Sequence, residues 1–242
     1  AAACGRPAVF LCGDEREVQV LSADLETLTG RRPVTLLGRE WQFRPGAVGS
    51  RDWERSRLAA LYALAQGDAP VVVATADGLM ARTLPPETLR SLAITLEVGG
   101  QAELGALAEQ LLSAGYTRCE QVEGVGQFAL RGGILDVFSP LMDQPVRCEF
   151  FDDEIDSLGA FDPGTQRRTE NVSSALLLPA AEVLPHCAPG GLPGLADQLT
   201  ALAEKLAKKQ KTEAIVQTLR EDAERLRSGA APGAADRDLA AI

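Results

Sequence analysis

The stretch GQFALRGGILDVFSP, residues 126–140, has the pattern of two apolar strands with one arginine and two glycines between them. Arg131 is followed by Gly132 and Gly133, which have no side chains. A guanidinium group can hold a carboxylate through two parallel hydrogen bonds, a geometry that lysine does not offer. The two glycines are typical of a bulge or of a turn with positive φ that redirects a strand. These residue types suggest an arginine presented to an acidic group of a partner.

The side on which Arg131 lies follows from strand alternation. In a strand over residues 127–131, Phe128 and Leu130 point one way, and Arg131 points the other way, to the solvated side. Arg118 shares that side only if a hairpin with a four-residue loop pairs it with Arg131. A three-residue loop pairs it with Gly132 and puts the two arginines on opposite faces.

Both arginines also have a purely structural interpretation. They can pair with nearby carboxylates in surface ion pairs that contribute little stability, and the candidates are Glu120, Glu123 and Asp136. The residues alone leave this alternative and partner binding open.

An acidic run, FFDDEIDS at residues 150–157, is the other charged feature. Its carboxylates could bind a hard cation, but the glycine-punctuated spacing of a calcium loop is missing. We expect a solvated acidic turn between two strands. The five cysteines contain no C-x-x-C pair, and His186 beside Cys187 has no second ligand pair, so we expect reduced thiols and no metal site.

Residue patterns for catalysis or nucleotide binding are missing from the sequence. No G-x-x-x-x-G-K-[ST] phosphate loop occurs, and the first lysine is Lys205. G-x-G-x-x-G is also absent, and the single histidine is not accompanied by a G-x-S-x-G nucleophile motif. We therefore expect neither a catalytic site nor a bound cofactor in this chain.

Net charge and hydropathy limit the class of partner. The formal charge of −10 and a pI near 4.7 argue against nucleic acid, because phosphate binding depends on clustered Lys and Arg, and favour a protein partner. No apolar run is long enough to cross a membrane, and residues 1–10 lack the regions of a signal peptide. We expect a cytoplasmic protein without a membrane partner and, since no initiator Met is present, a fragment of a longer chain.

Hydrophobic periodicity divides the 242 residues into three parts. Residues 1–90 alternate apolar runs with helical patterns, which predicts a β-α-β unit, a parallel sheet and a helix over 51–66 with Trp53, Leu58, Leu61 and Leu64 on or near one stripe. Residues 91–175 predict a small α+β domain with short strands at 116–122, 127–131, 134–138, 146–151 and 154–161. Residues 176–242 predict a return to the α/β core and a long amphipathic helix packed on it, with a break near KKQK.

The strings GYTRCEQVEGVGQFALRGGILDVFSP and VRCEFFDDEIDSLGAFDPGTQRR closely resemble the N-terminal region of the bacterial transcription-repair coupling factor (Mfd), a module similar to the excision-repair helicase UvrB. G-Y-x-R, R-G-G-I-x-D-x-F, E-F-F-x-x-E-I and F-D-P-x-T-Q-R occur in order. The resemblance is strongest over residues 115–180 and weaker on either side.

The resemblance implies a degenerate P-loop helicase-like (UvrB-type) parallel-sheet domain without an ATP site, interrupted by a small domain that binds the damage-recognition protein UvrA. It implies a non-catalytic module that recruits UvrA to stalled RNA polymerase. The ATP- and Mg-dependent motor of the family, and its binding of RNA polymerase and DNA, belong to domains that lie further toward the C-terminus in the family and are absent here.

Carried over by motif position, the UvrA-binding surface comprises Arg118 and Arg131, with Phe138 and Arg147 as additional candidates. UvrB-like chains often carry another arginine two residues before Arg131, where this chain has Ala129. Two alternatives remain from the sequence. The chain could be part of a UvrB-type ATP-dependent helicase whose phosphate loop lies upstream, or the small domain could be a structural spacer.

Overall fold

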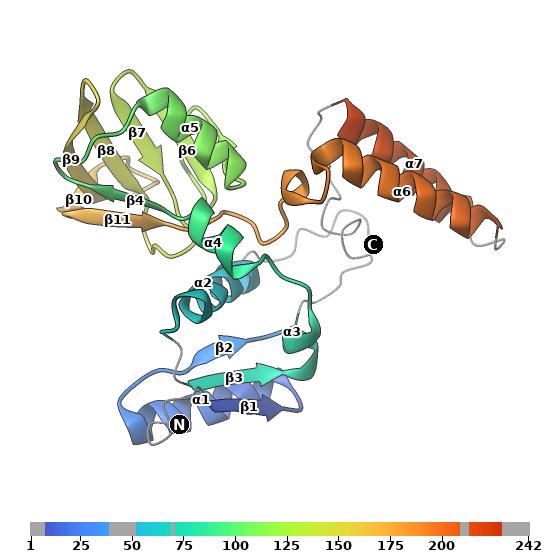
Figure 1. The fold of residues 1–242 in the computed structure, drawn as a ribbon. Coiled ribbons are helices and arrows are strands. Elements are labelled where there is room, and N and C mark those ends of the chain that lie inside the picture. Colours follow the sequence, from blue (N-terminus) through green and yellow to red (C-terminus); the bar gives the residue numbers. More distant parts are fainter. Residues whose placement is uncertain (1–7, 39–51, 69–70, 209–212, 229–242) are drawn as a thin grey trace. The chain divides into compact units, whose positions relative to one another are not determined.

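The computed structural model describes residues 8–38, 52–68, 71–208 and 213–228. They fall into two compact units, of which the first ends at Glu182 and the second begins at Val183. Each unit has a hydrophobic core of its own. Parallel and antiparallel sheets occur together with helices, which confirms the expected α/β class (Figure 1).

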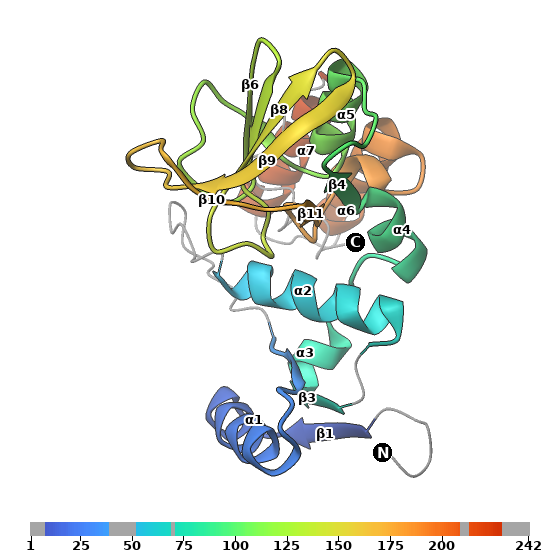
Figure 2. The same cartoon turned by 90° about the vertical axis from the view of Figure 1, so that its left-hand side faces the viewer.

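A small parallel sheet opens the first unit. It contains β1 (Ala8–Cys12), β2 (Val34–Leu36) and β3 (Val71–Thr75) in the order β1-β3-β2. β3 is paired on both edges, and its Val72, Val73 and Ala74 are buried. Helix α1 (Glu15–Thr29) connects β1 to β2 and packs Val18 against the sheet (Figure 2). The predicted β-α-β unit is confirmed.

Local signals explain where α1 begins and ends. The carboxylate of Asp14 accepts a hydrogen bond from the backbone N–H of Glu17, which satisfies one of the free donors at the helix start. Gly30 ends the helix with φ of 67°, a conformation that glycine adopts at little cost.

Three further helices complete this region, α2 (Asp52–Gln66), α3 (Ala76–Met80) and α4 (Pro86–Leu92). On the predicted stripe of α2, Leu58 and Leu61 are buried and Leu64 is half-buried, and the side chain of Trp53 lies outside the described ones.

The α+β part has a six-stranded sheet in the order β10-β9-β8-β7-β6-β5. Its strands are β5 (Thr117–Arg118), β6 (Gln127–Arg131), β7 (Ile134–Val137), β8 (Val146–Phe151), β9 (Glu154–Phe161) and β10 (Arg168–Asn171). Neighbours are antiparallel except for β5 and β6. Two more strands, β4 (Ile94–Glu97) and β11 (Ser174–Leu177), pair with each other.

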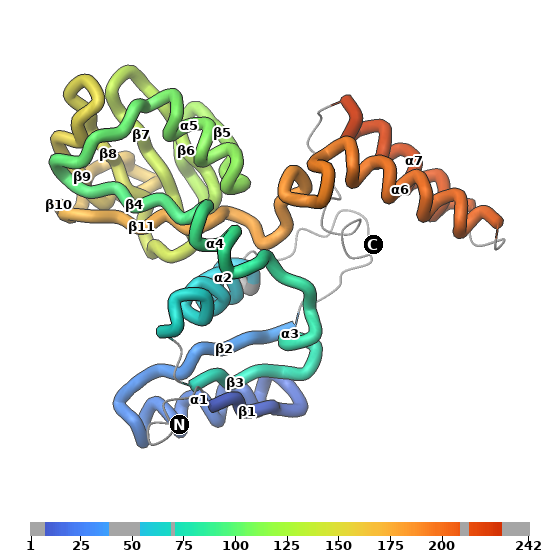
Figure 3. The backbone as a smooth tube through the Cα atoms, in the orientation of Figure 1, coloured from blue at the N-terminus to red at the C-terminus, as the bar shows by residue number. Residues whose placement is uncertain are grey.

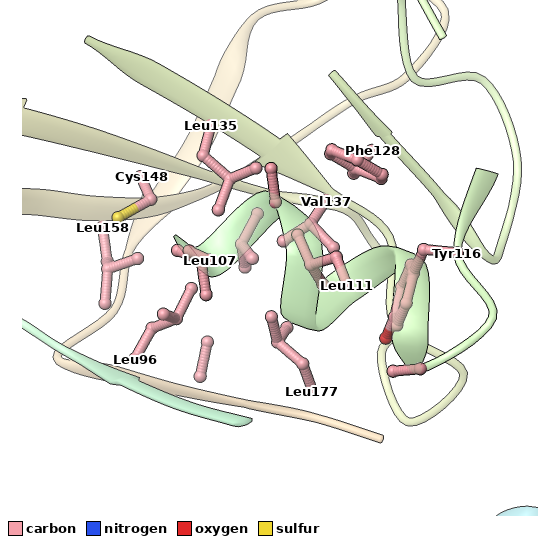
Figure 4. Packing of buried hydrophobic residues seen from close by; sticks show 14 of the residues in the cluster. Leu96, Leu107, Leu111, Tyr116, Phe128, Leu135, Val137, Cys148, Leu158 and Leu177 are labelled. Carbon is pink, nitrogen blue, oxygen red and sulfur yellow. The ribbon is translucent and has the colours of Figure 1, made fainter. Parts of the chain in front are cut away.

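One face of this sheet packs against helix α5 (Leu104–Ser113). Figure 4 shows Leu107 and Leu111 of α5 among Leu135, Val137 and Cys148 of the sheet. Leu111, Leu135 and Cys148 are completely buried. Alternation along β6, β7 and β8 sends every second side chain into this core, so the intervening residues must lie on the opposite face.

The predicted hairpin between strands 116–122 and 127–131 is wrong. β5 contains only two residues and runs parallel to β6, with Arg118 in register with Phe128. Figure 3 labels both strands along the course of the backbone. The parallel ladder is visible in the bond from the N–H of Cys119 to the carbonyl of Phe128, 2.9 Å.

The loop between β5 and β6 explains the different pairing. The second face of the sheet is the one that points away from α5. Val122 is fully buried in a cluster on this second face, so the loop crosses it instead of turning tightly. The amide oxygen of Gln127 accepts hydrogen bonds from the N–H groups of Glu123 and Gly124 and fixes the return. A periodicity argument within one strand cannot foresee such a tertiary contact.

The second unit contains a 3-10 turn, η1 (Pro185–Cys187), and helices α6 (Gly191–Lys208) and α7 (Glu213–Arg227). The predicted long helix is thus two helices on either side of residues 209–212. Their apolar faces form one shared cluster, which includes Leu195, Leu199, Val216 and Leu219. The expected packing of this stripe on the α/β core stays a prediction. Arg227 at the end of α7 binds Asp197 near the start of α6, so the helices are antiparallel.

Within the described ranges, no helix combines the length and apolar character needed to span a lipid bilayer. The residues of β11 contribute Ala175 and Leu177 to the core of the α+β part. The predicted domain boundaries after residues 90 and 175 stay predictions.

Candidate functional site

The second face of the six-stranded sheet carries two rows of side chains that the register places next to each other. One row is formed by Ala129, Asp136 and Arg147, which pair across β6, β7 and β8. The adjacent row contains Arg131, Ile134, Glu149 and Ser157. The arginines at 131 and 147 therefore lie on the same face, on two different strands.

A buried carboxylate holds both of these arginines. The side chain of Asp136 is 1% exposed, and its Oδ2 accepts a hydrogen bond from Nη2 of Arg131 at 2.5 Å. Nε and Nη2 of Arg147 donate to the two oxygens of the same carboxylate at 2.7 and 2.9 Å. A buried carboxylate requires such partners, because the loss of hydration would otherwise be costly. The three side chains of Arg131, Arg147 and Asp136 together carry one net positive charge.

Arg147 is fixed from several sides. Its Nη1 donates to the carbonyl oxygen of Gln166 at 3.3 Å, and its guanidinium lies over the ring of Phe161, 4.7 Å from the centroid. The hydrogen bonds to Asp136 raise the pKa of Arg147 above its ordinary value, so the group stays charged. Only 18% of the Arg147 side chain is exposed, so its main role is to hold Asp136 in place and not to contact a partner.

Arg131 is the more accessible of the two arginines. Its side chain is 47% exposed, and the Asp136 contact occupies one of its two Nη atoms. The five N–H donors of a guanidinium leave others free to bind a carboxylate from outside. Gly132 follows with φ of 61°, which confirms the predicted positive-φ turn, and β7 begins at Ile134. The residue is thus held at its base and open at its end.

Phe138 and Ala129 lie inside the cluster under the β5–β6 loop. Phe138 is 8% exposed and Ala129 is 1% exposed, and both pack with Val122 and Phe161. Burial gives Phe138 the role of supporting the face from within. Ala129 lies in the same cluster as Val122, so an arginine at this position would have no room in this packing.

Arg118 lies apart from the other candidates. It is exposed at the sheet edge, and its register with Phe128 puts it on the opposite side of the sheet from Arg131. Side chains of directly paired residues point to the same side, and Phe128 points into the α5 core. The sheet therefore brings together Arg131 and Arg147 but not Arg118.

Sequence reasoning treated Asp136 only as one of several surface partners and missed its central position. The available signal was a carboxylate between Leu135 and Val137 in a strand whose neighbours are apolar. A carboxylate in such a strand is either exposed to solvent or buried with a charged partner. The sequence alone does not show that the β5–β6 loop covers this face, so it did not indicate that Asp136 is buried.

The acidic turn is where the sequence predicts it. Asp152 and Asp153 connect β8 to β9, and Asp152 has φ of 53°. His186 and Cys187 lie in η1, and both are exposed. Among the residues that the structure describes, no three His, Cys, Asp or Glu side chains are grouped so that they could hold a metal ion.

The part of the chain that contains the six-stranded sheet matches a known protein family. Residues 94–182, which contain the whole six-stranded sheet and α5, match the family of the UvrB interaction domain. Residues 94–182 are called the UvrB interaction domain below, after the family that they match.

The chain is homologous to transcription-repair-coupling factors, which confirms the resemblance found in its motifs. It is 38% identical to that of Myxococcus xanthus over 186 residues, which cover 74% of this chain and 16% of the relative. The identity to that of Bacillus subtilis is 32% over 228 residues, 93% and 19% of the two chains. For Escherichia coli it is 35% over 178 residues, 73% and 15%. The chain thus matches less than a fifth of the length of these relatives.

Proposed function

We propose that the second face of the UvrB interaction domain binds UvrA, and that the chain is a non-catalytic module that recruits UvrA to stalled RNA polymerase. The observation that carries this proposal is the half-exposed guanidinium of Arg131, held at its base by the buried Asp136. A pre-ordered arginine loses less conformational freedom on binding a carboxylate than a free one does.

The name of the matching family and the homology to transcription-repair-coupling factors support a role in transcription-coupled repair. The acidic chain as a whole supports a protein as the partner. Contacts with RNA polymerase and DNA are proposed for other parts of the coupling factor.

We further propose that β1, β2 and β3 belong to a helicase-type domain that binds no nucleotide. Open parallel sheets bind ligands at the carboxyl ends of their strands. Here that end has a cleft of about 300 Å³ that is lined by the acidic residues Asp14, Glu15 and Asp77. A hydrogen bond from Thr75 lowers the pKa of Asp77, which keeps it anionic. Such a lining repels phosphate.

The UvrA proposal is tested by titrating purified UvrA with the chain and with an Arg131→Glu variant. Charge reversal at an interface core is expected to weaken binding by about a hundredfold or more. Arg82→Glu, an equal charge change at an exposed position of the α/β part, is the control and is expected to bind like the wild type. The unfolding temperature of both variants is measured to separate binding from stability.

Arg118→Glu in the same titration decides whether the other side of the sheet takes part. If the wild-type chain fails to bind UvrA, or if Arg131→Glu binds unchanged, the proposed function of this face is wrong.

A further inference from the structure

We propose that Phe151 is the apolar anchor of the same binding face. The partner segment that it implies carries a carboxylate for Arg131 next to an apolar side chain for Phe151. This inference rests on the proposed function, because it concerns the partner of that face.

Phe151 is unusually accessible for an aromatic residue in a strand. Its side chain is 74% exposed, the largest value among the bulky apolar residues of segment 94–182, all of which the structure describes. The residue ends β8, directly before the turn at Asp152. Its backbone is fixed by pairing with Glu154 of β9, so the ring is presented from an ordered strand.

Alternation along β8 determines which way the ring points. Phe150 packs against the α5 core, as does Cys148 two residues earlier. Phe151 therefore points to the opposite face, together with Arg147 and Glu149. This is the face on which Arg131 lies.

The two-glycine turn explains why the ring is left uncovered. Ile134 is in register with Glu149, and the N–H of Phe150 donates to the carbonyl of Gly133 at 2.8 Å. Continued in this register, the turn residue beside Phe151 is Gly132, which contributes no side chain. The space above Gly132 is open, since an added Cβ would have no heavy atom within 4 Å. The turn therefore has Arg131 on one side and Phe151 on the other, with a gap between them.

Aromatic residues and arginine are enriched in protein–protein interfaces, and arginine is among the residues that most often carry the binding energy. A buried phenylalanine removes about 150 to 250 Å² from water, far more than a small polar contact does. The acidic turn at Asp152 and Asp153 follows Phe151 and repels a carboxylate. The partner's carboxylate must then lie on the Arg131 side and its apolar side chain on the Phe151 side.

The experiment is a titration of purified UvrA with the wild-type chain, Phe151→Ala and Leu112→Ala. Leu112 is 44% exposed on α5, which covers the other face of the sheet, and serves as a matched apolar control. Phe151→Ala is expected to weaken binding about tenfold, with no change in unfolding temperature, whereas Leu112→Ala binds like the wild type. Phe151→Leu retains an apolar contact, so its affinity for UvrA is expected to lie between those of the wild type and Phe151→Ala.

Ionic strength and a double-mutant cycle add two readouts. Raising the salt concentration weakens the contribution of Arg131 but not that of Phe151, because only the former is a charge interaction. If both residues contact one segment, the effects of Arg131→Gln and Phe151→Ala are not additive. Binding of Phe151→Ala within twofold of wild type, while Arg131→Glu abolishes binding, overturns this inference and leaves the proposed function standing. Failure of the wild-type chain to bind UvrA overturns both.

Discussion

Arg131 and Arg147 donate hydrogen bonds to one carboxylate, that of Asp136, although 47% of the first side chain is exposed and only 18% of the second. The two arginines therefore have different roles. Arg147 neutralises and orients the buried carboxylate, and the carboxylate in turn fixes the base of Arg131. Changes at the three positions should therefore affect stability and binding to different degrees.

Asp136→Asn is expected to lower the free energy of unfolding by about 1 to 3 kcal/mol. The amide keeps the shape of the side chain but removes the charge that both guanidinium groups face. Their partial access to water keeps the loss below that of a fully buried pair. Urea unfolding measures the effect. Asp156→Asn, the same chemical change at an exposed position of β9, should stay within about 0.5 kcal/mol of wild type, and an equal loss in the two variants would contradict the buried role of Asp136.

Replacing each arginine by lysine separates the two roles. Arg147→Lys loses the two-point contact with Asp136 and the stacking on Phe161, so the unfolding temperature should fall by several degrees. Arg131→Lys keeps the charge at a half-exposed site, so stability should hardly change while affinity for UvrA falls by about tenfold. Paired melting and binding measurements test this. Equal loss of stability in both variants would show that Arg131 is as structural as Arg147.

Alternation and turn residues were sufficient to predict most of the α+β part. The strands expected at 127–131, 146–151 and 154–161 have those bounds in the structure, because each is an apolar run with turn residues at its ends. The solvated side of Arg131 followed from the same alternation. These features depend on neighbours within a few residues, which the sequence displays directly.

The features that the sequence did not predict depend on contacts between distant segments. Val122 is buried against Phe161, and this contact pulls the β5–β6 loop across the sheet and makes the strands parallel. The same loop buries Ala129 and closes the space beside Asp136. The exposure of Phe151 could not be foreseen either, since an FF pair in a strand does not indicate which ring has a neighbour above it.

A second buried ion pair lies in the first unit and connects α2 to the end of the UvrB interaction domain. Nε of Arg57 donates to both carboxylate oxygens of Glu182 at 2.9 and 2.8 Å, and the two side chains are 2% and 7% exposed. Nη1 of Arg57 donates to the carbonyl of Gly78 at 2.9 Å. Glu182→Gln removes one charge of this buried pair and is expected to lower the free energy of unfolding by about 3 to 5 kcal/mol.

The control for this pair is Glu170→Gln on the exposed strand β10, which should be nearly neutral. Replacing both partners by apolar residues, Arg57→Met with Glu182→Leu, should recover only part of the loss, because the carbonyl of Gly78 would lose a donor. Full recovery in urea unfolding would show that the arginine contributes nothing beyond the pair.

The start of α5 gives the stability of the UvrB interaction domain a dependence on pH. The carboxylate of Glu103 accepts hydrogen bonds from the backbone N–H groups of Gly105 and Ala106 at 2.8 and 2.6 Å, and these bonds lower its pKa below the ordinary value of 4.5. A carboxyl whose pKa is lower in the folded state stabilises the fold above its unfolded pKa. That contribution is lost as the pH falls through the folded value.

Glu103→Gln should therefore be less stable than wild type at pH 7, and the difference should shrink as the pH falls below 4.5. The amide keeps one accepting oxygen, so it can accept from one of the two N–H groups, and it carries no charge that titrates. Urea unfolding of both proteins between pH 7 and about pH 3 gives the comparison. Glu109→Gln, an exposed position of the same helix, should show no such narrowing. A difference between wild type and Glu103→Gln that stays constant with pH would mean that the charge of Glu103 contributes nothing to the helix start, and that the lost hydrogen bond accounts for the whole difference.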